Sequence, residues 1–215
     1  MSDDYEDEWR PTAVNERPEP PPTPQQLLTS AYLFEASLAV AAVLIGWLIG
    51  FWPLKTVELS PTALADNFIA AGVGVLAAGP LFAAAWGLWN LPIRRMRRLA
   101  RKVRRLLRPT FHEATVLELA LVSLIAGIGE ETLFRGLFQD ALATWIGGDA
   151  GMAIGLALSA VAFGVVHFVT REYAIMAGLA GLYLGGLFVL TDNLLAPIVA
   201  HAVYDFVAFW YLMRN

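Results

Sequence analysis

The chain has 215 residues, enough for one domain, and 57% of them are hydrophobic while only 16% are charged. This composition, with a mean hydropathy of +0.56, lies outside the usual range of soluble globular enzymes and indicates a membrane protein. The absence of cysteine excludes a disulfide framework, an iron–sulfur site and a cysteine nucleophile. The net charge of −4 combines an acidic N-terminal region with a basic segment further along the chain.

Residues 1–26 form the acidic region, in which Asp and Glu outnumber Arg and prolines cluster between Pro18 and Pro24. Such a segment buries too little apolar surface to offset the entropy that is lost on ordering. We therefore expect a disordered, Pro-rich cytoplasmic tail over residues 1–26, followed by one integral membrane domain over residues 27–215.

Six apolar stretches follow the tail, and most of them have about the 20 residues that a helix needs to cross the hydrocarbon core. The fifth stretch contains Gly178, Gly181 and Gly185, whose spacings of three and four suit close packing against another helix. We expect an all-α fold, a polytopic transmembrane bundle of about six helices. The stretches cover residues 27–51, 67–91, 116–146, 151–169, 173–190 and 194–213.

The segment between the second and third stretches is strongly basic. Its apolar residues recur at helical spacing, which predicts an amphipathic helix at residues 94–108 lying on anionic lipid. No aromatic residue interleaves the bases, so we do not expect nucleic acid as a partner. Basic loops lie on the cytoplasmic side, which predicts a multi-pass protein of the plasma membrane with both termini cytoplasmic. The bases are Arg94, Arg95, Arg97, Arg98, Arg101, Lys102, Arg104, Arg105 and Arg108.

Ionisable residues inside the apolar stretches are informative, because one charge near the centre of a membrane helix costs about 2.5–3.5 kcal/mol. The third stretch carries Glu130, Glu131 and Arg135. Glu131 and Arg135 are four positions apart with the acid first, the favourable order for an ion pair on one helix face. Glu130 points about 100° away from Glu131 and needs a partner on another helix. We expect Glu35 and Glu118, in other parts of the stretches, to snorkel or to pair with basic neighbours.

Partners for Glu130 are available on two other stretches. The fourth ends with Phe163 and His167, and the sixth contains His201 and Asp205, each pair four apart and so on one helix face. Acids and imidazoles on three helices indicate either a hydrolytic site or a proton relay. With straight helices Glu130 lies near mid-membrane and His167 near the cytoplasmic end of its segment. Tilt, or continuation of the fourth helix beyond the stretch, has to bring the two level.

Three motifs occur in order along these stretches: Glu-Glu-x-x-x-Arg at 130–135, Phe-x-x-x-His at 163–167 and His-x-x-x-Asp at 201–205. This order resembles the CPBP family of CAAX proteases and bacteriocin-processing enzymes, also called the Abi family. The resemblance covers residues 116–213. It implies a hydrolase, a glutamate-dependent intramembrane endopeptidase whose substrate is a membrane-associated peptide or protein.

Amide hydrolysis needs a positioned water, a base that takes its proton and donors for the developing oxyanion. With the support of the resemblance, we expect Glu130 to be the general base and His167 to hold the same water. His201 is expected to donate to the oxyanion.

The three other ionisable residues of the motifs, Glu131, Arg135 and Asp205, are expected to hold these groups in place. Glu131, tied to Arg135, would orient its own helix. Asp205 stands where many relatives carry asparagine, and an ionised aspartate has no proton to donate. We therefore expect Asp205 to orient His201 and to fix its tautomer.

Two alternatives stay open at this stage. An older interpretation of the family makes the same residues metal ligands, with Glu130, His167 and His201 binding zinc or another divalent cation. On the resemblance alone we favour a site with no metal and no other cofactor. The second alternative is a non-hydrolytic membrane protein, a proton-coupled transporter or a scaffold that keeps the fold without turnover.

Overall fold

The computed structural model describes residues 20–58 and 60–214, and every regular element in these residues is a helix. Residues 1–19 of the predicted disordered tail lie outside the described residues. The elements in chain order are α1 (Pro24–Leu48), α2 (Leu64–Asn90), α3 (Arg94–Phe111), α4 (Val116–Glu131), the π-helix η1 (Thr132–Gln139), α5 (Asp140–Ile146), α6 (Gly148–Val166), α7 (Arg171–Thr191) and α8 (Leu195–Arg214).

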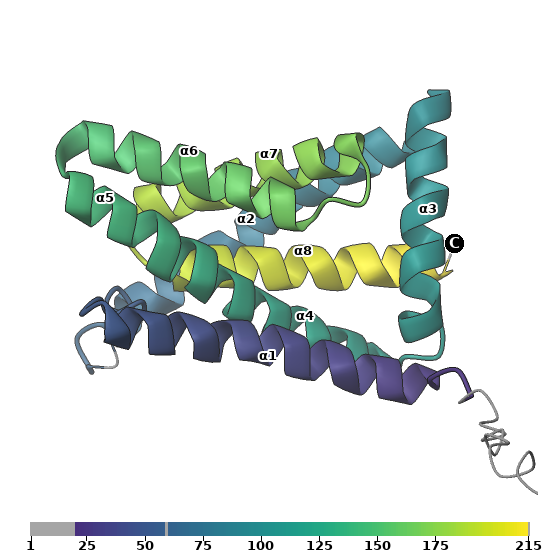
Figure 1. Cartoon of the computed structure of the whole chain (residues 1–215), viewed down its shortest axis with the longest axis horizontal. Helices are drawn as coiled ribbons and strands as arrows, with labels where there is room; N and C mark the ends of the chain where they lie inside the picture. Colours follow the sequence, from purple (N-terminus) through teal and green to yellow (C-terminus); the bar gives the residue numbers. More distant parts are fainter. Residues whose placement is uncertain (1–19, 59, 215) are drawn as a thin grey trace, which may run out of the picture.

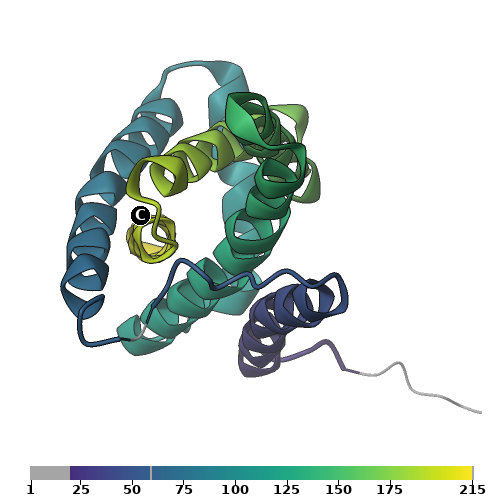
Figure 2. The ribbon, with the colours of Figure 1, turned by 90° about the vertical axis from the view of Figure 1, so that its left-hand side faces the viewer.

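The helices form a bundle along one axis, with α3 lying across one end (Figure 1). The start of α1 and the end of α8 lie at the α3 end of the bundle. Seen along that axis, the other helices are grouped around α8 (Figure 2), which packs against α2, α4, α7 and α3. The predicted all-helical bundle is confirmed.

Five helices are long and apolar enough to cross a membrane: α1, α2, α6, α7 and α8. The remaining predicted span, the third along the chain, is the continuous run α4–η1–α5, residues 116–146. It is long and apolar enough to cross a membrane only when it is taken together with α3, from which it is bent by 111°. Charged residues lower its hydropathy, and several of them belong to the predicted site. Six is therefore the upper count of spans.

Capping residues set the starts of two helices. Thr23 and Gln26 form a capping box that begins α1 at Pro24, three residues before the predicted apolar stretch. At the start of α4, the N–H of Glu118 donates to Oγ1 of Thr115 at 3.2 Å, while the N–H of Thr115 donates to Oε2 of Glu118 at 2.8 Å. Glu118 thus caps its own helix, whereas the sequence predicted that it would snorkel or pair with a basic neighbour.

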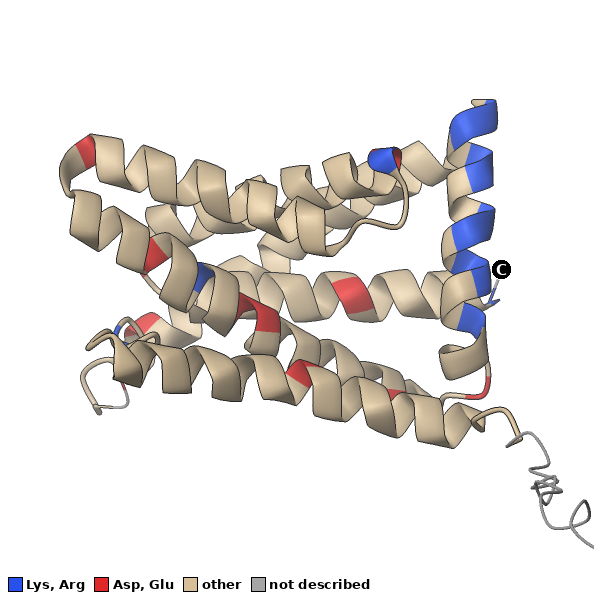
Figure 3. Ribbon diagram, viewed as in Figure 1, with Lys and Arg blue, Asp and Glu red and all other residues tan. Residues whose placement is uncertain are grey.

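The helix α3 is amphipathic, as predicted for residues 94–108. Leu99 and Val103 are buried and pack against Leu212 of α8. Basic residues are distributed along the helix (Figure 3), and all of them except the half-buried Arg104 are exposed. The exposed basic face therefore lies at the same end of the bundle as the start of α1 and the end of α8.

Glycines allow the closest helix contacts around α8. A Cβ at Gly74 of α2 would lie 2.5 Å from the carbonyl O of Ala196 and 2.9 Å from Cβ of Val199. Gly127 of α4 makes a comparable approach from the other side, where a Cβ would lie 2.8 Å from the carbonyl O of Ile198. Backbones that approach so closely tolerate no larger side chain, since a packed interior has no space to accept it.

We predict that Gly74→Leu destabilises the bundle by about 1–3 kcal/mol, because the new side chain overfills the α2–α8 contact. Gly72→Leu is the matched control on the same helix, since a Cβ there meets nothing within 4 Å. Thermal unfolding in detergent measures both variants. Equal melting temperatures for the two variants would contradict the packing described for α2 and α8.

Candidate active site

A fully buried ion pair stands at the centre of the site. Nη1 of Arg135 donates to Oε1 of Glu131 at 2.9 Å, and neither side chain has any exposed surface. The pair spans the junction of α4 and η1, where α-type hydrogen bonding changes to π-type. A π-helix has more residues per turn than the roughly 3.6 of an α-helix, so side chains four apart stay more nearly in line. The structure therefore contains the pair that the spacing predicted.

Two polar side chains of η1 donate hydrogen bonds to the backbone of α7. Nη2 of Arg135 donates to the carbonyl O of Gly181 at 3.0 Å, and Nε2 of Gln139 donates to that of Gly185 at 3.1 Å. A Cβ at Gly181 would lie 3.3 Å from Nη2 of Arg135, and one at Gly185 would lie 2.5 Å from Oε1 of Gln139. Gly178 approaches the backbone of α6. The predicted close packing at these glycines is confirmed, and two of them make room for the buried polar side chains.

His201 of α8 binds the carboxylate of the buried pair. Its Nδ1 lies 2.7 Å from Oε1 of Glu131, the oxygen that also accepts from Arg135. An ionised carboxylate only accepts hydrogen bonds, so Nδ1 carries a proton and donates it to Glu131. Nε2 of His201 then carries a proton only in the imidazolium form.

Asp205 faces the other nitrogen of the same ring, with its Oδ2 3.4 Å from Nε2 of His201. The shorter contact, which fixes the ring and its tautomer, is made by Glu131 at 2.7 Å. Asp205 stands where a negative charge favours a proton on Nε2. His201 therefore lies between two carboxylates, an arrangement that stabilises its charged form.

His167 brings α6 to Glu130. Its Nε2 lies 3.5 Å from Oε2 of Glu130, and its Nδ1 donates to the carbonyl O of Phe163 at 2.8 Å. A carbonyl cannot donate, so the neutral ring presents an unprotonated Nε2 toward Glu130. The fourth helix does not continue past its apolar stretch, since α6 ends at Val166 and His167 is its C-cap. His167 and Glu130 meet through the relative placement of α6 and α4, and the predicted extension of the fourth helix is not needed.

Phe163 packs between the charged groups. Its ring centroid lies 4.4 Å from that of His167 in a stacked arrangement and 6.0 Å from that of His201. The guanidinium carbon of Arg135 lies 4.5 Å from the same centroid. A buried aromatic ring that touches two imidazoles and a guanidinium fixes their separations and adds cation–π attraction.

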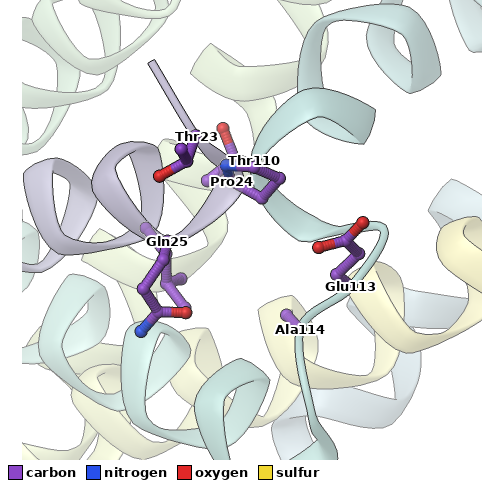
Figure 4. Close-up of a pocket in the computed structure, with 7 residues that line it drawn as sticks. Thr23, Pro24, Gln25, Thr110, Glu113 and Ala114 are labelled. Carbon is purple, nitrogen blue, oxygen red and sulfur yellow. The ribbon is translucent and has the colours of Figure 1, made fainter.

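Exposure shows from which side the site is accessible. The side chain of His167 is 27% exposed and that of Asp205 is 19% exposed, while Glu130 is at 11%. A separate pocket of about 230 Å³ opens between the start of α1 and the α3–α4 loop (Figure 4), and no predicted site residue lines it. Of these three side chains, His167 and Asp205 are the more exposed.

The alternative metal ligands do not form a ligand set. In the part of the chain that the structure describes, no group of three His, Asp or Glu side chains is placed to hold one metal ion. Nδ1 of His167 is bonded to a carbonyl and Nδ1 of His201 to Glu131. We derive no catalytic step through a metal ion.

Sequence reasoning missed two supporting residues. Gln139 is 2% exposed and continues the line of Glu131 and Arg135. Its spacing of four from Arg135 in an apolar stretch is a signal that could have found it. Ser159 of α6 donates from Oγ to the carbonyl O of Phe134 at 2.8 Å, which gives that π-helix carbonyl a buried partner. No sequence pattern marked Ser159, because its partner lies on another helix.

The fold and the site define a class of protein, a polytopic helical membrane protein with acids and imidazoles from α4, α6 and α8 gathered at one place. Residues 112–207 match the model of a family described as Type II CAAX prenyl endopeptidase Rce1-like. This match confirms the resemblance to the CAAX protease family and indicates a CAAX-type intramembrane protease. The match leaves α1, α2 and α3 outside. Comparison with curated proteins and with solved structures gives no significant match.

We predict that Arg135→Met destabilises the protein by about 3–5 kcal/mol, because it leaves the charge of Glu131 buried without its partner. The double variant Glu131→Gln/Arg135→Met removes both charges and recovers part of that loss. Denaturation of the purified variants in detergent measures the two effects. A double variant no more stable than the single one would show that the buried charge is not what destabilises Arg135→Met.

Proposed function

We propose that the chain is an intramembrane endopeptidase of the glutamic type, which hydrolyses a peptide bond of a membrane-associated protein or peptide. The observation that carries the proposal is the pairing of Glu130 with Nε2 of His167 at 3.5 Å, beside a His201 whose ring is held by Glu131 and Asp205. Acid, imidazole and a second imidazole on three helices are the parts that amide hydrolysis requires. The family match of residues 112–207 supports the same reaction class.

Glu130 and His167 would prepare the water. A water between Oε2 of Glu130 and Nε2 of His167 donates one hydrogen bond to each acceptor, which directs a lone pair of its oxygen toward the substrate. Glu130 removes the proton as the oxygen attacks the carbonyl carbon. Phe163 keeps His167 in place during this step, through ring stacking and through the carbonyl that accepts from Nδ1.

His201 would stabilise the oxyanion. Its charged form is favoured by Glu131 on one nitrogen and by Asp205 on the other. The contact from Nε2 to Asp205, at 3.4 Å, is longer than a good charged hydrogen bond. That proton is therefore available to a substrate oxygen that becomes negative, and a preorganised donor in a dry site is worth most at that moment.

We predict that Glu130→Gln lowers kcat by about 10²–10⁴-fold while the protein stays folded, because the amide has the same size as the carboxylate but cannot accept the proton of water. His167→Ala is expected to act in the same direction through loss of the water's second acceptor. Cleavage of an anchored reporter peptide by the purified variants in vesicles measures both effects. Glu113→Gln, an exposed acid in the α3–α4 loop, is the control and is expected to behave as the wild type.

Two results of that assay would change the proposal. A wild-type chain that turns over no anchored peptide would favour the non-hydrolytic scaffold or transporter. Activity that is lost in a chelator and recovered with zinc would favour the metal alternative, whereas we expect cleavage to continue in the chelator.

We further propose an orientation in which the α3 end faces the cytoplasm of a cell whose plasma membrane holds the protein. The exposed basic face of α3 would lie on anionic lipid, since each base near such a surface contributes about 1 kcal/mol. Basic residues retained on the cytoplasmic side are the general basis for this assignment. Both chain termini would then be cytoplasmic, with the α1–α2 loop outside.

The chain has no native cysteine, so single-cysteine variants report orientation directly. We predict that Thr62→Cys, in the α1–α2 loop, reacts with a membrane-impermeant maleimide in intact cells. Glu113→Cys, at the α3 end, is expected to react only after permeabilisation. The reverse pattern would overturn the orientation while leaving the site unaffected.

A further inference from the structure

Glu35 is a carboxyl group that the proposed mechanism does not use. It is the one charged residue of α1, in the middle of a helix that otherwise offers only apolar and small polar side chains. A charge at such a position costs about 2.5–3.5 kcal/mol unless something compensates for it. Because α1 lies outside the residues that match the family, nothing in that match accounts for Glu35.

The packing of α1 places Glu35 beside the site. Gly129 of α4 comes so close that a Cβ there would collide with the carbonyl O of Glu35, and Gly129 directly precedes Glu130. The carboxylate of Glu35 lies within electrostatic range of groups on three helices: Glu130 of α4, His167 of α6, and His201 and Asp205 of α8. Its Oε2 is buried and has no hydrogen-bond partner among the described residues.

The charges of the site do not balance if every carboxyl group is ionised. The site contains four carboxyl groups, Glu35, Glu130, Glu131 and Asp205, and three groups that can be positive, Arg135, His167 and His201. Even with all three positive, one carboxyl group is left unbalanced, and the proposed mechanism uses His167 in its neutral form. Arg135 contacts Glu131, His167 contacts Glu130, and His201 contacts both Asp205 and Glu131. Glu35 is left without a cation within ion-pair distance among the described residues. For a carboxyl group in that position, burial and the neighbouring anions Glu130 and Asp205 oppose ionisation, while His201 and His167 favour it.

We propose that Glu35 is a further catalytic residue, the acid that protonates the leaving nitrogen of the scissile peptide bond. This role rests on the proposed endopeptidase function and adds a step to it. Expulsion of an amine from the tetrahedral intermediate needs a proton on the nitrogen, because an amide anion is too basic to leave. A protonated carboxyl beside the site can supply it.

The protons balance over one turnover. Glu130 takes a proton from water, and the hydroxide oxygen bonds to the carbonyl carbon. Glu35 gives its proton to the nitrogen, the carbon–nitrogen bond breaks with its electron pair on nitrogen, and the amine leaves beside a carboxylic acid product. Glu130 is then protonated and Glu35 ionised, and transfer of one proton from Glu130 to Glu35 restores the starting state. Water is the only co-reactant.

The test compares two leaving groups in the full-length protein. An anchored reporter peptide that the wild type cleaves is prepared with its amide and with a phenolic ester at the scissile bond, because a phenolate leaves without prior protonation. We expect Glu35→Gln to lower kcat on the amide by about 10²-fold with KM nearly unchanged, and to lower kcat on the ester by less than about fivefold. Glu35→Asp, which keeps an acid, is expected to recover part of the amide activity.

Ser37→Ala is the matched control on α1, since Ser37 is exposed and bonds only to its own helix, through the carbonyl O of Phe34. It is expected to cleave both substrates as the wild type does. Equal losses on amide and ester in Glu35→Gln, or no loss on either, would overturn the role of Glu35. Failure of the proposed function itself is distinguishable, because then the wild type would cleave neither substrate or Glu130→Gln would still cleave both. If Glu35→Gln does not fold, the amide-to-ester ratio of Glu35→Asp decides, and an unchanged ratio counts against the proposal.

Discussion

Burial of charge in an apolar bundle is the constraint on which the rest of the structure depends. Arg135 and Glu131 have no exposed surface, and neither can lose its partner without leaving an uncompensated charge. Each also binds another helix: Glu131 binds His201 of α8, and Arg135 binds the carbonyl of Gly181 on α7. One ion pair therefore joins α4, η1, α7 and α8 in a single arrangement.

Departures from ordinary helix geometry serve this arrangement. The π-helix η1 carries Arg135 and Gln139, which both donate to carbonyls of α7, while Glu131 just before it binds His201 of α8. The glycines of α7 lie opposite Arg135 and Gln139 and leave space for these long polar side chains. Small residues in membrane helices usually allow backbones to approach each other. Here Gly181 and Gly185 also admit a guanidinium and an amide, which receive carbonyl partners in return.

The proposed catalytic residues and their surroundings come from different portions of the chain. Residues 112–207, which match the CAAX protease family, contain Glu130, His167 and His201. The helix α1 lies outside this segment, yet it packs on α4 and η1 and brings Glu35 next to the site. The helix α3 closes one end of the bundle, with its apolar face against α8 and its bases outward. A segment outside the family match therefore packs directly against the part of the chain that forms the site.

The sequence by itself determined which segments are helical and membrane-embedded, because apolar runs of the right length and an amphipathic basic segment leave few other structures. It also identified the six ionisable residues of the site, since a charge in an apolar stretch is too costly to stand without a purpose, and the i, i+4 spacing predicted the Glu131–Arg135 pair. Only the tertiary structure decided that Glu131, at the shorter distance, holds His201, that α6 ends at Val166, and that Gln139 and Glu35 join the cluster. These facts depend on distances between helices far apart in the chain, and the spacing of residues along one helix carries no information about which helix lies beside it.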